Sequence, residues 1–139
     1  MTRYSRQRML AEVGDEGQRR LGAARVLIVG VGGLGSPVAM YLAAAGVGRI
    51  RLADDDSVSL DNLQRQILYT EADISSPKAE CAARRLRAMN SDITVEAHIV
   101  RVDKDNIRSL AEGCDVVVDG CDNFATRYIA VSYTHLTLP

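Results

Sequence analysis

Val26-Leu-Ile-Val29-Gly30-Val-Gly32-Gly33-Leu-Gly35 is the stretch that decides the fold, because it joins a short apolar run to a glycine-rich turn. Residues 33–45 are rich in alanine and leucine and predict a buried helix, which ends at Gly46 or Gly48. The alternating residues 49–52 then predict a second, more exposed strand. A strand, a glycine turn and a helix are the parts that hold a phosphate against backbone N–H groups and a helix N-terminus.

A carboxylate follows at the distance that this arrangement requires. Asp54 comes directly after the second strand, about 20 residues past the last glycine, where such folds bind a ribose. We therefore expect the chain to bind a nucleotide that has both a ribose and phosphates.

The rest of the chain continues the alternation of helices and strands. Residues 3–23 are polar and predict one or two short helices, broken near Gly14. The pattern then predicts a short helix at 61–68, a helix that begins at Ser76-Pro77, a strand at 93–100, a short helix at 106–111 and a strand at 116–118. We expect an α/β fold with a Rossmann-like, mostly parallel sheet of about four strands, flanking helices and right-handed crossovers.

Composition and charge exclude several classes of protein. The chain has 139 residues, of which 47% are hydrophobic and 25% charged, as in a single domain with a real core. A net charge of −1 gives no general attraction to nucleic acid or to a membrane, and no apolar run reaches the ~20 residues of a membrane helix. Because the N-terminus has no apolar signal segment, we expect a cytoplasmic protein.

Neither the three cysteines nor the two histidines predict a metal site. Cys81, Cys114 and Cys121 form no Cys-x-x-Cys pair, and their odd number argues against a disulfide framework. We expect Cys81 and Cys114 to pack in the core. Cys121 falls in a loop beside the predicted site, where a reactive thiol is the alternative to packing. His98, in a predicted strand, and His135 have no ligand partners nearby in sequence.

Positive charges after the second strand distinguish between two nucleotides. Such a glycine turn is by default an NAD site, where the helix N-terminus suffices for the about two charges of a pyrophosphate. Here Arg65 and Lys78 begin near the sheet edge where ligands bind, and Arg6 adds a third cation. Asp122, just past the fourth strand, is placed to hold Mg²⁺. Three cations and a metal carboxylate suit ATP, with about four charges, better than NAD.

Each of these residues also has a plain structural interpretation. Arg65 suits a solvated helix surface, Asp54-Asp55-Asp56 a solvated turn, and Asp122-Asn123 a helix cap. Lys78 near a helix start opposes the helix dipole, which favours a functional reason for it. Two other classes of protein stay open. One is an NAD(P)-dependent oxidoreductase domain, which leaves the cations unexplained, and the other is a non-catalytic nucleotide-binding partner subunit.

Taken together, the motifs resemble the ThiF/MoeB/HesA family, the bacterial relatives of ubiquitin-activating enzymes. The matching motifs over residues 3–129 are, in the family's order, Arg3-Tyr-Ser-Arg6-Gln7, Gly30-Val-Gly-Gly-Leu-Gly35, Ala45-Gly-Val-Gly48, Asp54-Asp-Asp56, Asn62-Leu-Gln-Arg65-Gln66, Pro77-Lys78 and Asp122-Asn123. The resemblance implies an ATP-dependent adenylyltransferase that activates the C-terminal glycine of a ubiquitin-like sulfur carrier protein and releases pyrophosphate. The implied pathways are thiamine and molybdenum cofactor biosynthesis.

The resemblance also implies roles for single residues. Asp54 would bind the ribose hydroxyls, and Asp122 would bind Mg²⁺. Arg6 would reach the site of a neighbouring subunit, so the implied active form is a homodimer. The implied nucleotide-binding residues are Gly30, Gly32, Gly33, Gly35, Asp54, Asp56, Asn62, Arg65, Gln66 and Lys78, among which Gly32 and Gly35 line the nucleotide and Asn62, Arg65 and Lys78 contact the phosphates. The implied catalytic residues are Arg6, Arg65, Lys78 and Asp122.

The end of the sequence departs from the family pattern. The resemblance places the loop over the adenylate, most of the carrier's docking surface and the paired Cys-x-x-Cys ligands of a Zn²⁺ ion beyond residue 139. We therefore expect residues 1–130 to form an incomplete ATP-binding adenylation domain that is inactive alone. Residues 131–139 are rich in threonine and β-branched side chains, and we expect a frayed or non-native tail there.

Overall fold

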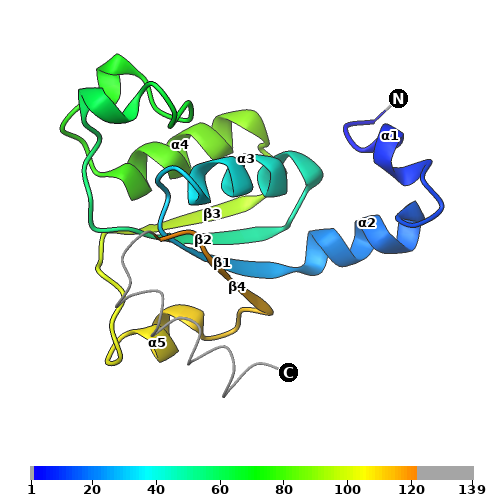
Figure 1. Ribbon diagram of the computed structural model, residues 1–139. Coiled ribbons are helices and arrows are strands. Elements are labelled where there is room, and N and C mark those ends of the chain that lie inside the picture. The colour runs from blue at the N-terminus through cyan, green and yellow to red at the C-terminus, as the bar shows by residue number, and fades with distance from the viewer. Residues whose placement is uncertain (1, 122–139) are drawn as a thin grey trace.

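A computed structural model describes residues 2–121 of the chain (Figure 1). Its sheet has four parallel strands in the order β3-β2-β1-β4. The strands are β1 (Arg25–Val29), β2 (Arg49–Ala53), β3 (Thr94–His98) and β4 (Val116–Asp119). The α-helices are α1 (Ser5–Arg8), α2 (Gly14–Ala23), α3 (Gly35–Ala45), α4 (Lys78–Met89) and α5 (Ile107–Ala111), and two short 3₁₀ turns are η1 (Leu60–Asn62) and η2 (Glu71–Asp73). The predicted parallel α/β sheet is confirmed.

The strand order explains which helices cover which face. The chain passes from β1 to β2 to β3 in one direction, and then returns past β1 to place β4 at the other edge. Because crossovers between parallel strands share one hand, this reversal moves the last helix to the opposite face. Figure 1 shows this arrangement, with α3 and α4 on one side of the sheet and α5 on the other.

Alternation along the central strand fills both layers of the core. Val26 and Ile28 belong to the larger cluster, which they form with residues of α3 and α4. Leu27 and Val29 belong to the second cluster, with residues of α5 and with Cys121. Burial on both faces is the reason why this strand is a continuous apolar run. The packing predicted for Cys81 and Cys114 is confirmed, because Cys81 lies in the first cluster and Cys114 packs against the second.

The N-terminal helices form an arm at the amino ends of the strands. Gln7 of α1 donates from Nε2 to the carbonyl of Ala45, at 2.7 Å. The hydroxyl of Tyr4 accepts a bond from Asn90, also at 2.7 Å. These contacts join the arm to the C-terminal ends of α3 and α4, and Figure 1 shows α1 and α2 extending away from the sheet. The expected break near Gly14 is confirmed, because α2 begins there.

The second strand lies inside the sheet, and its two faces differ in burial. β2 lies between β1 and β3, and Ile50 and Leu52 are fully buried. Arg51, on the other face, is itself mostly covered and its Nε lies 2.9 Å from a carboxylate oxygen of Glu96. Its Nη1 also donates to the carbonyls of Leu110 and Glu112, at the end of α5. The alternation in residues 49–52 therefore marks an internal strand that is more exposed than β1 only at Arg51, as the sequence predicts.

Two local predictions around the 60s and 70s are wrong. Residues 61–68 do not form a helix, because a capping box between Ser59 and Asn62 closes the short turn η1 and the chain then continues through successive turns. The helix expected to start at Ser76-Pro77 begins at Lys78 instead. Pro77 is held extended by an antiparallel bridge to Ser57, which prevents it from being the first helical residue.

No helix within residues 2–121 is long and apolar enough to cross a lipid bilayer. Asp122, Asn123 and the tail at 131–139 lie outside the described residues.

Candidate nucleotide-binding site

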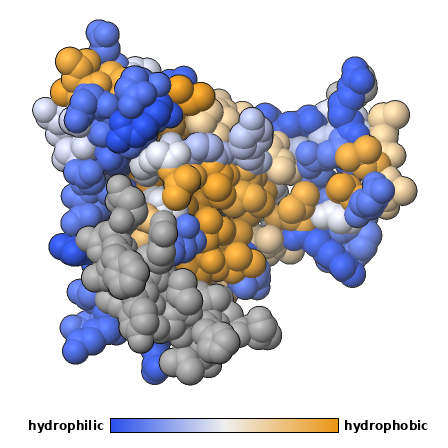
Figure 2. Space-filling model, in the orientation of Figure 1, coloured by the Kyte–Doolittle hydropathy of each residue, from blue (hydrophilic) through white to orange (hydrophobic). Residues whose placement is uncertain are grey.

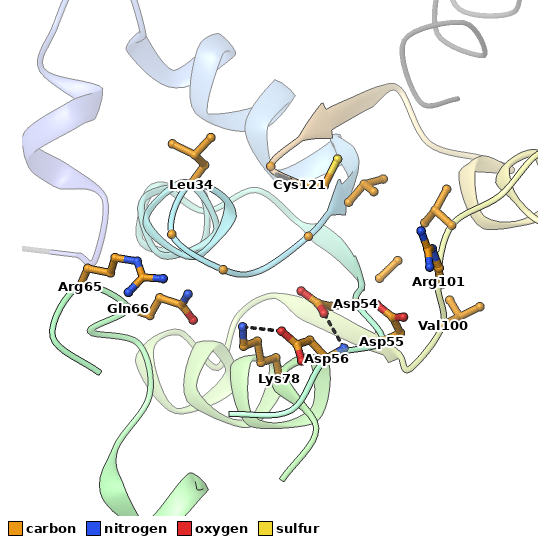
Figure 3. Close-up of a pocket in the computed structure, with 17 residues that line it drawn as sticks. Leu34, Asp54, Asp55, Asp56, Arg65, Gln66, Lys78, Val100, Arg101 and Cys121 are labelled. Carbon is orange, nitrogen blue, oxygen red and sulfur yellow. Dashed lines mark hydrogen bonds and ion pairs between the residues drawn. The ribbon is translucent and has the colours of Figure 1, made fainter. Parts of the chain in front are cut away.

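A pocket of about 600 Å³ lies where the carboxyl ends of all four strands meet. This edge is where ligands bind in open parallel sheets. The residues that line the pocket are Val29, Gly30, Gly32, Gly33, Leu34, Ala53, Asp54, Asp55, Asp56, Arg65, Gln66, Lys78, Val100, Arg101, Val102, Gly120 and Cys121. Figure 3 shows Arg65 and Gln66 at one end, Asp54, Asp56 and Lys78 in the middle, and Val100 and Arg101 at the other end.

The glycine turn brings three backbone segments closer together than side chains would allow. Gly30 has a φ of +89°, which L-residues rarely adopt. A Cβ atom on Gly35 would lie 1.7 Å from the carbonyl oxygen of Gly30, and one on Gly120 would lie 2.6 Å from Cα of Gly35. Gly35 is not among the residues that line the pocket, and its contact with a nucleotide stays a prediction. It lets the first turn of α3 lie directly against β1 and the end of β4.

The turn is fixed on both sides of Val31. Its N–H donates to Oδ2 of Asp54, at 2.8 Å, and its carbonyl accepts from the hydroxyl of the buried Tyr69. Burial raises the pKa of Tyr69, so its hydroxyl stays protonated and remains a donor. Tyr69 was not predicted to support the site, because nothing in the sequence pairs it with a residue 38 positions earlier.

Asp54 binds the backbone with both carboxylate oxygens. Besides the bond from Val31, its Oδ1 accepts the N–H of Asp56 at 2.8 Å. Burial raises the pKa of Asp54, while these two backbone bonds oppose that shift. A carboxyl whose pKa is raised on folding contributes proton-linked stability below its unfolded pKa, and this contribution is lost as pH rises through the folded pKa. Each oxygen of the ionised carboxylate retains a lone pair that can accept a hydroxyl of a ligand.

Lys78 is a buried cation that Asp56 holds at two points. The side chain of Lys78 is 5% exposed, and its Nζ lies 3.0 Å from Oδ2 of Asp56, whose own side chain is 67% exposed. The N–H of Lys78 also donates to the carbonyl of Asp56, at 2.9 Å. The bridge between Ser57 and Pro77 sets up this pairing, so the turn after β2 fixes the first residue of α4 in the pocket.

Gln66 and Arg65 supply further polar groups at the same end. Gln66 is buried, and its Oε1 has no hydrogen-bond partner among the described residues. In Figure 3 its amide points into the pocket between Arg65 and Lys78. Arg65 is exposed and donates to the carbonyl of Asp61 at 3.1 Å. A buried amide oxygen without a partner is rare in folded proteins, and a bound ligand, water or ion is a common reason for it.

Four lining residues at the opposite end were not predicted as ligand contacts. Val100, Arg101 and Val102 follow β3, and Cys121 follows β4. The thiol of Cys121 donates to Oδ1 of Asp119, at 2.8 Å. The predicted position of Cys121 beside the site is confirmed. The three residues after β3 were not predicted, because no sequence motif marks them.

Besides Gly35, three residues from the predicted set lie elsewhere or cannot be placed. Asn62 does not line the pocket, and its Oδ1 accepts bonds from the N–H and hydroxyl of Ser59. Arg6 is exposed on α1, in the arm at the amino ends of the strands. Asp122 lies outside the described residues, although it directly follows Cys121, which lines the pocket. The roles of all three stay predictions.

Within residues 2–121, no group of three or more His, Cys, Asp or Glu side chains is placed to hold a metal ion. The predicted Mg²⁺ ligand lies beyond this range, and the Zn²⁺ ligands were expected beyond residue 139.

Comparison with known proteins gives the family. The model of the ThiF family matches residues 4–137. The chain belongs to the ThiF family. Among curated relatives of the chain, the SAMP-activating enzyme E1 of Haloferax volcanii is 51% identical over 93% of the chain. The sulfur carrier protein ThiS adenylyltransferase of Escherichia coli is 49% identical over 90% of the chain. The chain spans 48% and 50% of the length of these two relatives.

Solved structures agree with this assignment. The tRNA N6-threonylcarbamoyladenosine dehydratase TcdA of E. coli, in complex with AMP, has a TM-score of 0.92 and 29% identity. The match covers 99% of this chain and 56% of TcdA. E. coli MccB with MccA-N7isoASN has a TM-score of 0.85 and 30% identity, over 99% of this chain and 42% of MccB. Members of the same fold therefore have been solved with an adenine nucleotide and with MccA-N7isoASN.

Proposed function

We propose that the protein is an ATP-dependent adenylyltransferase that activates the C-terminal glycine of a ubiquitin-like sulfur carrier protein, in thiamine or molybdenum cofactor sulfur transfer. The observation that carries the proposal is the buried Lys78 in one pocket with the glycine turn, Asp54 and Gln66. Its support from comparison is the 49% to 51% identity to relatives named ThiS adenylyltransferase and SAMP-activating enzyme.

The proposed reaction needs charge stabilisation rather than a protein nucleophile. A carboxylate oxygen of the carrier's terminal glycine forms a bond to the α-phosphorus of ATP, and the bond from this phosphorus to the oxygen that bridges to the β-phosphate breaks. The products are an acyl adenylate and pyrophosphate, and no proton is exchanged. Because two anions must approach each other, cations that face the phosphates lower the barrier electrostatically.

We propose that the ribose and the phosphates are held by different parts of the pocket. In our proposal Asp54 accepts the ribose hydroxyls, and the lining part of the glycine turn, from Gly30 to Gly33, receives phosphate oxygens near the N-terminus of α3. Lys78 and Arg65 contact the phosphates that become pyrophosphate. Gln66, whose Oε1 lacks a partner among the described residues, contacts the ligand as well. Asn62 reaches the phosphates only through its amide nitrogen, since Ser59 already donates to its Oδ1.

The divalent ion is proposed from the chemistry of the donor set. Mg²⁺ in such sites is held by one or two carboxylates together with phosphate oxygens, and it keeps several waters. One carboxylate that follows the lining residue Cys121 in the chain fits this pattern, and we propose Asp122. When bound, Mg²⁺ would neutralise charge on the phosphates.

A homodimer is part of the proposal, because Arg6 lies at the opposite end of the sheet from its own chain's pocket. Arg6 therefore serves the pocket of a second subunit. Large apolar side chains are exposed on the same arm and on α3, with Met9 and Tyr41 each 78% exposed. Figure 2 shows a broad hydrophobic area on the visible face, over the strands below α3. Burial of such side chains between subunits would drive association.

Two measurements test the proposed function. Calorimetry with the intact protein should show binding of ATP with Mg²⁺ and none of NAD, and tight NAD binding without ATP binding would favour an oxidoreductase. Labelled pyrophosphate should exchange into ATP only when a cognate carrier protein is present. ATP binding without exchange for any ubiquitin-like carrier would favour a non-catalytic nucleotide-binding subunit.

A further inference from the structure

Arg101 is the third cationic side chain of the pocket, and its position separates it from the other two. It follows β3, which is the edge strand next to β2, whereas Lys78 and Arg65 lie toward the glycine turn. Figure 3 shows Arg101 at the far end from Arg65, with Asp54 between them. Neighbouring strands of a sheet are about 4.8 Å apart, so the ends of β1 and β3 are about 10 Å apart.

The backbone that carries Arg101 is firmly held while its side chain is not. Asn106 donates from Nδ2 to the carbonyl of Arg101 at 2.9 Å, and its Oδ1 accepts the N–H of Asp103 at 2.8 Å. Val102, the next residue, is 3% exposed. Arg101 is exposed, and among residues 2–121 its guanidinium makes no hydrogen bond or ion pair. A fixed backbone and a side chain without a partner suit a contact with a ligand.

The pocket floor beside Arg101 is apolar. The lining residues Val29, Ala53, Val102 and Cys121 belong to the second core cluster, and Val100 packs against it. This cluster therefore reaches the surface at one end of the pocket. The other end carries Arg65, Gln66 and Lys78, which are suited to phosphates. A nucleotide whose ribose lies at Asp54 and whose phosphates lie at the cationic end must place its base over this apolar floor.

We propose that Arg101 determines base binding by stacking its guanidinium plane on the purine, with the apolar floor on the opposite face of the ring. This inference rests on the proposed function, since it takes ATP as the ligand. A guanidinium is planar and weakly hydrated, and it stacks on aromatic faces, whereas an ammonium group does not. Stacking explains why an arginine at the base end needs no carboxylate partner and does not compete with Lys78 for the phosphates.

The test measures the binding of three ligands, with and without a base or a triphosphate, to three variants of Arg101. Arg101→Ala, Arg101→Lys and Arg101→Tyr would be made in the intact protein, with Arg108→Ala as a control on the exposed face of α5. Calorimetry would use ATP, AMP and ribose 5-triphosphate, which lacks the base. Arg101→Ala should weaken ATP and AMP by the same factor, roughly 10-fold, and leave ribose 5-triphosphate unchanged. Arg101→Tyr, which keeps a plane, should retain most of the affinity, while Arg101→Lys should resemble Arg101→Ala.

The same variants separate recognition from catalysis. In the exchange assay Arg101→Ala should raise KM for ATP by the same factor and leave kcat within about twofold, because the base does not react. Unfolding of each variant should match the wild-type protein, since the side chain has no partner among residues 2–121 to lose.

Four results would overturn the inference. One is unchanged ATP binding in Arg101→Ala while the wild-type protein binds ATP. A second is a loss that grows with the number of phosphates and is restored by lysine, which means a phosphate contact. A third is a rise in KM for the carrier alone, which means a contact to the carrier's carboxylate. Finally, a wild-type protein that binds neither ATP nor AMP overturns the proposed function, and this inference with it.

Discussion

Replacing Lys78 by methionine removes the buried charge of the pocket and keeps most of its volume. The Lys78 side chain is 5% exposed, so an alanine would leave a cavity and confuse a loss of function with a loss of stability. A unit charge about 4 Å from a phosphoryl oxygen is worth roughly 4 kcal/mol at an effective dielectric constant near 20. Removal of one preorganised donor at a reacting oxyanion costs about 10²- to 10³-fold in kcat. We therefore expect Lys78→Met to lower kcat for adenylation by roughly 10²- to 10³-fold.

Carrier-dependent exchange of labelled pyrophosphate into ATP measures this effect. Lys104 is the only other lysine of the sequence and is exposed outside the pocket, so Lys104→Met is the matched control and should keep wild-type exchange. Asp56→Asn should cost less than Lys78→Met, because Asp56 acts by holding Lys78. In the double mutant, the change at Asp56 should add little. A folded Lys78→Met protein with exchange within threefold of wild type would refute the reasoning and return Lys78 to a structural role.

Three further predictions concern other parts of the site. Mixing inactive Arg6→Ala chains with inactive Asp122→Ala chains should restore part of the pyrophosphate exchange, because one site in a mixed dimer is intact. If mixed dimers form and exchange is not restored, Arg6 acts in cis or lies outside the site. Gly35→Ala should lower the free energy of unfolding in urea by about 4 kcal/mol or more, since its Cβ would lie 1.7 Å from the Gly30 oxygen. In the control Gly22→Ala the new Cβ meets no atom within 4 Å, so this variant should be neutral or stabilise α2. Similar urea midpoints for the two variants would contradict the close approach. Because burial raises the pKa of Asp54, ATP affinity should fall on acidification at a higher pH than an ordinary aspartate would give. Asp54→Asn should abolish this acid-side fall in the pH profile of ATP binding. A fall that persists in Asp54→Asn belongs to another group.

Local patterns in the sequence were enough to predict the layers of the fold. The apolar run at 26–29, the glycine turn and the alanine-rich helix each have a short-range signal, and each lies within a residue or two of its predicted place. The positions of Asp54 and Lys78 in the pocket follow from the general placement of ligands at the carboxyl edge of parallel strands. Periodicity and one topological rule therefore place the centre of the candidate site.

Contacts between distant segments were not predictable in the same way. The helix expected at 61–68 has helix-compatible residues, but the capping box at Ser59 and the burial of Gln66 and Tyr69 favour successive turns instead. The bond from Tyr69 to Val31 and the guanidinium of Arg101 depend on where two loops meet in space. No local pattern encodes such a meeting, because the partners are far apart in the sequence and neither segment contains a signal for the other.

The burial of Lys78 is itself an argument for an anionic ligand. Removing an ammonium group from water costs several kcal/mol, and a single carboxylate offsets this cost only when the pair is well formed and itself desolvated. Asp56 is 67% exposed, so water screens its attraction for Lys78. Water would also solvate the carboxylate of Asp56 equally well without Lys78. Lys78 also begins α4, where the positive end of the helix dipole opposes a cation. A structural pair with Asp56 does not account for a lysine placed at such cost, whereas several phosphate charges in the same pocket do.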